Sequence, residues 1–371
     1  MQQLIQSNTK LGFGLMRLPR REDKTIDIHE TSAMVDAFLE AGGTYFDTAF
    51  IYNGSEEAAR AALCSRYPRE SYYLATKLHA AGSFCKSEQQ ARDEINISLE
   101  RSGAGYFDFY LLHSLETENV EVYDRYGLWD YLRELRQQGL IRHYGFSFHS
   151  TPEMLDRLLT DHPDVEFVQM QLNYADWDEP AVQSRACYEV AVRHDKPVIV
   201  MEPVKGGLLA NPPERVRKVF AALDPEASCA SWAIRFAASL PQTAVVLSGM
   251  SSMAQMRDNL SYMKDLRPLD AREQAAIVQA REILQSYDRI SCTGCRYCTE
   301  GCPMEIAIPD VFRVLNRYRM YGDLTAARRE YAWRAGKVPA SACVGCGQCE
   351  SVCPQHLPVI RLLEEAAQSL E

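Results

Sequence analysis

Two cysteine runs near the C-terminus place the strongest constraint on this chain. They are Cys292-Thr-Gly-Cys295-Arg-Tyr-Cys298-Thr-Glu-Gly-Cys302-Pro303 and Cys343-Val-Gly-Cys346-Gly-Gln-Cys349-Glu-Ser-Val-Cys353-Pro354. Each run has the C-x2-C-x2-C-x3-C-P spacing of proteins with two four-iron clusters, in which the fourth cysteine ligates the other cluster. We therefore predict two 4Fe-4S clusters, one on Cys292, Cys295, Cys298 and Cys353 and the other on Cys343, Cys346, Cys349 and Cys302.

Zinc sites and disulfide bonds explain these cysteines less well. Structural zinc sites usually pair two Cys-x-x-Cys units, whereas each run here has three cysteines at the same short step. The N-terminus shows no charged and then apolar signal segment, which favours a cytoplasmic location where thiols stay reduced. The other four cysteines are scattered, as expected of small buried side chains: Cys64, Cys85, Cys187 and Cys229.

Composition excludes several classes of protein. The chain has 371 residues, 46% of them hydrophobic and 24% charged, so it is globular and long enough for two domains. Its formal net charge of -10 argues against a nucleic-acid partner, because nucleic-acid binding needs a basic surface. No apolar run approaches the ~20 residues that cross a bilayer, so no membrane partner is expected either.

Before the cysteine runs, short apolar or β-branched segments alternate with segments of helical spacing, which is typical of repeated βα units. The predicted strands are 11–16, 44–48, 73–77, 107–113, 143–148, 167–172, 197–202 and 244–248. Eight strands, each followed by a helix, fit a closed (β/α)8 TIM barrel, and the chain lacks the Gly-rich fingerprint of a Rossmann domain. We predict this α/β barrel over residues 1–286 and a smaller, mostly α-helical ferredoxin-type domain over residues 287–371.

The ends of the second, third and fourth strands carry titratable side chains. Asp47 and Tyr52 follow the second strand, Lys77 ends the third and His113 ends the fourth. The C-terminal ends of barrel strands meet at one mouth, where the catalytic groups of such barrels lie. Lys77 would lower the pKa of the Tyr52 phenol, and Asp47 would keep Lys77 charged. His113 would donate a hydrogen bond to a carbonyl oxygen, which makes the set a proton-donating site.

Several motifs resemble the aldo/keto reductase family over about residues 10–265. They are Gly43-Thr-Tyr-Phe-Asp47-Thr-Ala-Phe-Ile-Tyr52 with Ser55-Glu56, Leu-Ala-Thr-Lys77, Asp108-Phe-Tyr-Leu-Leu-His113, Tyr144-Gly-Phe-Ser147, and Gly249 to Asn259-Leu260. The resemblance implies an NAD(P)-dependent oxidoreductase that binds NADPH or NADH without a Rossmann fold. It also implies hydride transfer that interconverts a small aldehyde or ketone and an alcohol, with Tyr52 as the general acid.

The same resemblance assigns residues to the nicotinamide nucleotide. Ser147 and Gln169 fall where the family holds the nicotinamide amide, and Met201 replaces the aromatic residue that commonly covers the ring. At the adenosine end, the matching positions are Gly249, Gln255 and Asn259. Phe148 stands where the family often has asparagine, and Arg257 is the one basic candidate near Gly249 for a 2′-phosphate, so the choice between NADPH and NADH stays open.

The roles of Glu202 and of the aromatic loop residues each have two possible interpretations. Glu202 is either a substrate ligand or the ion-pair partner of Lys205. The loops expected to select the substrate, residues 64–72, 80–87, 115–127 and 174–179, carry aromatic side chains that line a pocket or cover the mouth: Phe84, Tyr123, Tyr126 and Trp177.

The cysteine-rich segment resembles helical two-cluster ferredoxin domains that are fused to oxidoreductases. A hydride carries two electrons and a cluster accepts one at a time, and the chain has no flavin motif to connect them. An alternative function is therefore electron transfer, in which the clusters and a ferredoxin or flavoprotein partner are coupled to substrate oxidation. A cluster-based redox sensor is a further alternative.

Overall fold

The computed structural model describes residues 9–80, 85–179, 182–290, 292, 294, 296–335, 337–353 and 355–371. The chain divides into two compact units, residues 1–211 with 220–277 and residues 212–219 with 278–371. This division falls inside helix α12 (Ala271–Gln285), so the predicted boundary between residues 286 and 287 stays a prediction. Within the described ranges, no helix has the length and apolar character needed to span a lipid bilayer.

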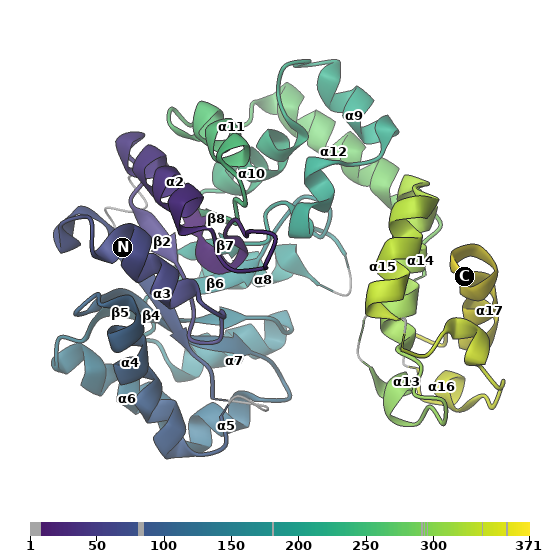
Figure 1. Ribbon diagram of the computed structural model, residues 1–371, viewed down its shortest axis with the longest axis horizontal. Coiled ribbons are helices and arrows are strands. Elements are labelled where there is room, and N and C mark those ends of the chain that lie inside the picture. The colour runs from purple at the N-terminus through teal and green to yellow at the C-terminus, as the bar shows by residue number, and fades with distance from the viewer. Residues whose placement is uncertain are drawn as a thin grey trace. The chain divides into compact units, whose positions relative to one another are not determined.

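The first unit is the predicted barrel of eight parallel strands (Figure 1). Each strand pairs with the next in chain order, and β8 pairs with β1 to close the ring. The strands are β1 (Leu11–Gly14), β2 (Tyr45–Asp47), β3 (Tyr73–Leu78), β4 (Phe107–Leu115), β5 (Ile141–Phe148), β6 (Val168–Gln171), β7 (Val198–Met201) and β8 (Thr243–Ser248). Their ends lie within two residues of the predicted ones, and β1 passes into a 3₁₀ turn at Leu15–Arg17.

Alternate residues of each strand face opposite sides, and both sides are apolar here. One set fills the barrel interior and includes Tyr45, Ala75, Phe109, Leu111, Phe167, Ile199 and Leu247. The residues between them, such as Phe46, Tyr110 and Leu112, belong to the larger core between strands and helices. At Gly145 a Cβ atom would lie 2.4 Å from the Phe167 carbonyl oxygen, so only glycine fits where β5 approaches β6.

Helices cover the outside of the strands (Figure 1). They are α2 (Ile28–Glu40), α3 (Ser55–Ala59), α4 (Glu88–Ser102), α5 (Val120–Arg125), α6 (Leu128–Gln137), α7 (Pro152–Asp161), α8 (Ser184–Arg193), α10 (Cys229–Ser239) and α11 (Met253–Met263). Ser87, Thr151 and Ser252 cap the starts of α4, α7 and α11 by accepting backbone N–H bonds. The helical ring closes where the Met253 N–H donates to Glu30 of α2 at 3.1 Å.

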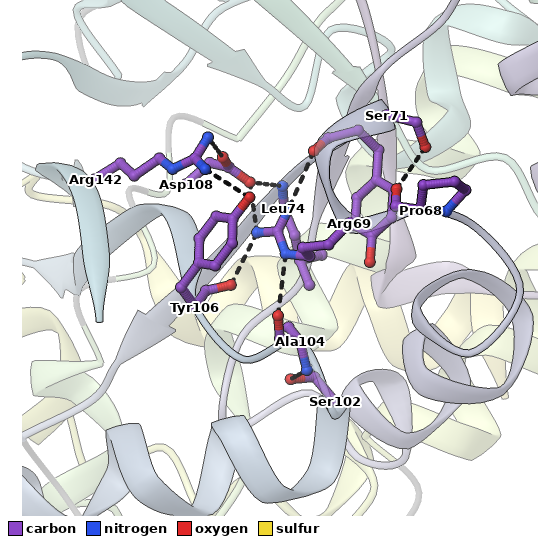
Figure 2. A network of polar contacts seen from close by, with 10 residues as sticks. Pro68, Arg69, Ser71, Leu74, Ser102, Ala104, Tyr106, Asp108 and Arg142 are labelled. Atoms are coloured by element: carbon purple, nitrogen blue, oxygen red, sulfur yellow. Dashed lines mark hydrogen bonds and ion pairs between the residues drawn. The ribbon is translucent and has the colours of Figure 1, made fainter. Parts of the chain in front are cut away.

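A buried carboxylate joins the starts of three strands (Figure 2). Asp108 of β4 is 1% exposed, and its two oxygens accept from Arg69 at 2.6 Å and from Arg142 of β5 at 3.1 Å. The same carboxylate accepts the Leu74 N–H of β3 at 2.9 Å. Arg69 also donates to the carbonyl of Tyr106 at 2.8 Å. This network lies at the N-terminal end of the barrel, where barrel residues serve stability rather than catalysis.

The second unit is mostly helical, as predicted. It contains most of α9 (Glu214–Ala221) and the helices α13 (Tyr297–Glu300), α14 (Ile308–Tyr321), α15 (Leu324–Arg334), α16 (Gln348–Ser351) and α17 (Val359–Leu370). Val311 and Leu315 of α14 and Leu363 of α17 share one buried apolar core. Pro309 stands in the first turn of α14, where proline is favoured because it has no N–H to leave unpaired.

At their described positions, the two cysteine runs share backbone features. Each has two residues with left-handed φ at matching positions, Gly294 and Arg296 in the first run and Gly345 and Gly347 in the second. Each then enters a short helix, α13 or α16, and these two helices lie together at one end of the unit (Figure 1). The sequence repeat is therefore also a structural repeat.

Candidate functional site

The alternation of the strands aims three of the predicted catalytic side chains into the barrel mouth. Tyr45, Ala75 and Leu111 occupy the interior of β2, β3 and β4. The next residues of the same parity are Asp47, Lys77 and His113, and they are buried. Side chains two apart on a strand share a face, so these polar groups lie on the interior face at the C-terminal ends of their strands.

Lys77 and Asp47 form a buried ion pair at this mouth. The Lys77 ammonium donates to Asp47 Oδ1 at 2.5 Å and to the Thr48 carbonyl at 2.7 Å. Asp47 Oδ2 is buried and has no hydrogen-bond partner among the described residues. Burial raises the pKa of Asp47, and the neighbouring Lys77 charge opposes this rise. The Lys77 amine is thus anchored beside Asp47 by two hydrogen bonds.

Tyr52 lies in the turn after β2, beside this pair. The Lys77 ammonium is 5.1 Å from the centre of the Tyr52 ring, and the His113 ring is 5.6 Å away, edge to face. Burial raises the pKa of Tyr52, and the Lys77 charge opposes this rise without outweighing it, so the net shift is opposite to the lowering expected from the sequence. The phenol therefore keeps its proton at neutral pH, which is the state that a proton donor needs.

His113 is a neutral imidazole in this environment. Burial is the largest cause that lowers its pKa well below the ordinary value, and the Lys77 charge acts in the same direction. Its ring also faces that of His79 at 5.6 Å. A neutral imidazole can donate a hydrogen bond to a carbonyl oxygen without giving up its proton. The four predicted catalytic residues thus gather at one mouth.

The residues assigned to the nicotinamide lie on the neighbouring strands. Ser147 is the second-last residue of β5, and its hydroxyl oxygen accepts the Ser114 N–H at 2.6 Å. Gln169 of β6 is 2% exposed, and its Oε1 atom is buried without a partner in the described chain. Met201 ends β7 and packs against the apolar barrel interior. A buried amide oxygen without a partner is a group that a ligand donor would satisfy.

The residues assigned to the adenosine end follow β8. Gln255 accepts the Ser251 N–H at 2.7 Å through its side-chain oxygen. Asn259 is 4% exposed, and its amide donates to Ser248 at 2.7 Å. Both side chains are therefore held by the protein's own hydrogen bonds. The Arg257 side chain is exposed on the same helix, α11.

The structure adds Arg17, which the sequence analysis missed. A Cβ atom on Gly249 would lie 3.5 Å from Arg17 Cδ, and one on Gly206 would lie 4.0 Å from its Nη2 atom. Arg17 thus reaches from the loop after β1 across the start of the loop after β8 toward the loop after β7. Those last two loops form the phosphate site of many barrels. The strand-end rule, if applied to β1, would have selected it.

The structure decides between the two readings of Glu202 and Lys205. Lys205 forms an ion pair with Asp176, which is 1% exposed, and not with Glu202. The Glu202 backbone is left-handed, with φ of 54°, and its carbonyl accepts the Lys205 N–H at 3.0 Å and the Asn173 amide at 3.2 Å. Glu202 also raises the pKa of Tyr52, after larger contributions from burial and Asp47, so its carboxylate lies near the mouth.

The aromatic residues of the loops serve mainly as cover. Tyr123 is fully buried, Trp177 packs against Phe236 at 5.4 Å, and Tyr126 is partly buried against the core. Phe84 lies outside the described residues.

Two cavities in the second unit collect the cysteines in the predicted combination. The first is lined by Cys292 and Cys298 of the first run and Cys353 of the second. The other is lined by Cys343, Cys346 and Cys349 together with Cys302. The last cysteine of each run therefore crosses to the other cavity. Cys295 lies outside the described residues.

These cavities differ from the site of a single metal ion. Among the described residues, no three histidine, cysteine or acidic side chains converge closely enough to hold one ion. Thiolates spread around a cavity suit a cluster, whose iron atoms each take one protein ligand, better than one tetrahedral zinc ion.

Comparisons with known proteins identify related sequences. The model of the aldo/keto reductase family matches residues 10–282, and that of a 4Fe-4S dicluster domain matches residues 291–357. An aldo-keto reductase of Mycolicibacterium smegmatis is 32% identical over 152 residues, which are 41% of this chain and 50% of that protein. The chain thus spans about half the length of that relative. YqkF, an uncharacterized oxidoreductase of Bacillus subtilis, is 24% identical over 290 residues, covering 68% of this chain and 86% of that protein.

Solved structures share the barrel. The holo form of the aldo-keto reductase AKR11C1 from Bacillus halodurans has a TM-score of 0.59 and 24% identity, covering 73% of this chain and 91% of that one. An aldo-keto reductase from Klebsiella pneumoniae in complex with NADPH has a TM-score of 0.57 and 20% identity, covering 73% and 90%. At these identities the likeness concerns the fold alone.

Proposed function

The chain belongs to the aldo/keto reductase family, and from this premise we propose that it is an NAD(P)-dependent oxidoreductase that interconverts a small carbonyl compound and an alcohol, with Tyr52 as general acid and base. The observation that carries the proposal is the convergence of a protonated phenol, a buried ammonium–carboxylate pair and a neutral imidazole at one barrel mouth.

Each of the four side chains has its own role in transferring a proton to the carbonyl oxygen. A reduced nicotinamide bound at this mouth would supply the hydride to the carbonyl carbon. Tyr52 gives its phenolic proton to the carbonyl oxygen, and the Lys77 ammonium stabilises the phenolate that remains. Asp47 holds Lys77 in place through the 2.5 Å contact. His113 donates a hydrogen bond to the same oxygen, which orients the carbonyl toward the phenol.

The neighbouring residues fit a nicotinamide nucleotide. The buried Gln169 oxygen without a partner suits the amide N–H of a carboxamide, and the Ser147 hydroxyl can donate to its oxygen. Arg17, between the loops after β7 and β8, suits a phosphate group. Arg257, exposed on α11, remains the candidate for binding a 2′-phosphate. Its replacement by alanine would therefore weaken the binding of NADPH more than the binding of NADH.

Tyr52→Phe tests the catalytic proposal. Removing the phenolic hydroxyl deletes the proton donor, so kcat for carbonyl reduction with NADPH or NADH should fall about 100- to 10,000-fold, with nucleotide binding retained. Tyr67→Phe is a matched control, because the Tyr67 hydroxyl donates to Asp36 on the helical layer instead. Steady-state kinetics on a panel of aldehydes and ketones measures both; undiminished turnover in Tyr52→Phe would exclude the phenol as the acid.

We further propose that the second unit holds two 4Fe-4S clusters on the crossed cysteine sets that line the two cavities. Such clusters would supply one-electron redox chemistry. Protein purified without air should then contain about eight iron atoms per chain by the cysteine count. In spectra of the reduced protein, Cys353→Ser should alter the same cluster signal as Cys292→Ser, and Cys302→Ser the same signal as Cys343→Ser. Pairing within each run instead would reverse this pattern.

A further inference from the structure

The end of β4 departs from regular strand geometry at the catalytic histidine. The pairing of β4 with β5 shifts register between Leu112 and Leu115, so His113 and Ser114 form a bulge. Ser114 has a left-handed φ of 58°, and its N–H is taken by the Ser147 hydroxyl. A bulge takes its residues out of the regular ladder, so their backbone groups need partners from elsewhere.

A side chain from α5 meets this need. The Tyr123 hydroxyl donates to the His113 carbonyl at 2.5 Å and accepts the Ala80 N–H at 3.3 Å. Tyr123 is 0% exposed, and burial raises the pKa of its phenol, so the hydroxyl stays protonated and remains a donor. One buried hydroxyl therefore joins the end of β4 to the chain just past the end of β3.

The neighbouring backbone N–H is held in a similar way. Glu94 of α4, 2% exposed, accepts the His79 N–H at 2.8 Å. Two consecutive amides after Lys77, those of His79 and Ala80, are thus fixed by side chains from two helices. The His79 ring in turn lies 5.6 Å from the His113 ring.

We propose that Tyr123 is a positioning residue that fixes His113 relative to Lys77 and Tyr52 by bonding to the His113 carbonyl and the Ala80 N–H. The proposal rests on the proposed function, because it assigns Tyr123 to the same proton-donating site. Tyr123 itself contacts no reacting atom. It acts through the backbone of His113, whose ring must point at the carbonyl oxygen.

The test replaces Tyr123 by phenylalanine in the full chain with its clusters. Misplacing an orienting group should lower kcat about 10- to 100-fold while leaving the KM for the nicotinamide nucleotide within about twofold. Tyr131→Phe is the matched control, because the Tyr131 hydroxyl makes the same kind of bond, to the Arg92 carbonyl at 2.6 Å, between α6 and α4. It should lose similar thermal stability and keep its kcat.

A double mutant distinguishes a positioning role of Tyr123 from a general loss of structural stability. If Tyr123 acts through His113, then Tyr123→Phe should change kcat by less than about twofold in a His113→Ala background. An unchanged kcat in Tyr123→Phe, an equal loss in Tyr131→Phe, or an undiminished loss in the His113→Ala background would each overturn the proposal.

A second measurement does not depend on turnover. In histidine-labelled protein followed by NMR, the His113 imidazole should titrate closer to its ordinary pKa in Tyr123→Phe than in the wild type, and should be unmoved in Tyr131→Phe. An unmoved His113 resonance in Tyr123→Phe overturns the positioning role. A wild type that reduces no carbonyl with either nucleotide would overturn the proposed function, while this titration still decides the role of Tyr123.

Discussion

Each end of the barrel contains a buried carboxylate, and the two carboxylates differ in how fully they are hydrogen-bonded. At the N-terminal end both oxygens of Asp108 are bonded, by two arginines and a backbone N–H (Figure 2). At the mouth, Asp47 has one oxygen on Lys77, and the other has no partner in the described chain. A saturated carboxylate locks strands together, whereas a partly bonded one leaves groups available to a ligand. The difference separates stability from chemistry within one fold.

The backbone shows the same difference. The mouth contains non-glycine residues with left-handed φ, Ser114 at 58° and Glu202 at 54°, and the bulge at the end of β4. Such conformations cost free energy and persist where surrounding contacts impose them. Here these contacts come from Ser147, Asn173 and Lys205. The N-terminal end of the barrel, which we call its base, thus stabilises a fold whose mouth contains strained backbone.

The largest expected effect is on catalysis at the mouth. Asp47→Asn removes the charge that holds Lys77, so kcat for carbonyl reduction should fall about 100- to 1000-fold, equivalent to about 3–4 kcal/mol. Steady-state kinetics and a denaturant titration measure activity and stability in parallel. The comparison of the two ends would be wrong if this variant kept its kcat.

At the base, Asp108→Asn should cost stability rather than activity. The amide cannot neutralise two arginines, of which Arg69 is 17% exposed and Arg142 is 52% exposed. Allowing for that solvent screening, we expect the free energy of unfolding of the barrel to fall by about 3 kcal/mol. The kcat per folded molecule should stay at the wild-type value. A large loss of kcat in folded Asp108→Asn protein would show that the base also sets the geometry of the mouth.

Glu94 offers a smaller, pH-dependent effect beside the mouth. Burial raises its pKa to about 8, so the folded state binds a proton that the unfolded state releases near pH 4.5. Stability from this group is complete below pH 4.5 and declines as pH rises toward 8. Relative to Glu94→Gln, the wild type should therefore lose roughly 3–4 kcal/mol of unfolding free energy between pH 5 and 8. Denaturant titrations of both proteins across this pH range measure the effect. If the unfolding free energies of wild type and Glu94→Gln changed in parallel with pH, Glu94 would be ionised throughout and the prediction would be wrong.

Local periodicity predicted the elements better than it predicted the loops. All eight strands and the main helices follow from apolar spacing, because a buried face repeats every two or 3.6 residues. Helix α5 lies in a predicted loop; its Val120 and Val122 disfavour a helix locally, and the burial of Val120 and Tyr123 outweighs that preference.

The amino-acid sequence was enough to place the chemically active side chains along their strands and cysteine runs. The period of two placed Asp47, Lys77 and His113 on the interior face, and the cysteine spacing predicted the crossed sets, which share cavities in the structure. The contacts between groups that are far apart in the chain became visible in the folded protein. Folding brought Arg17 beside Gly249, paired Lys205 with Asp176 instead of Glu202, and placed the Tyr123 hydroxyl on the His113 carbonyl. Closing a ring joins segments far apart in the chain, and no local pattern specifies those contacts.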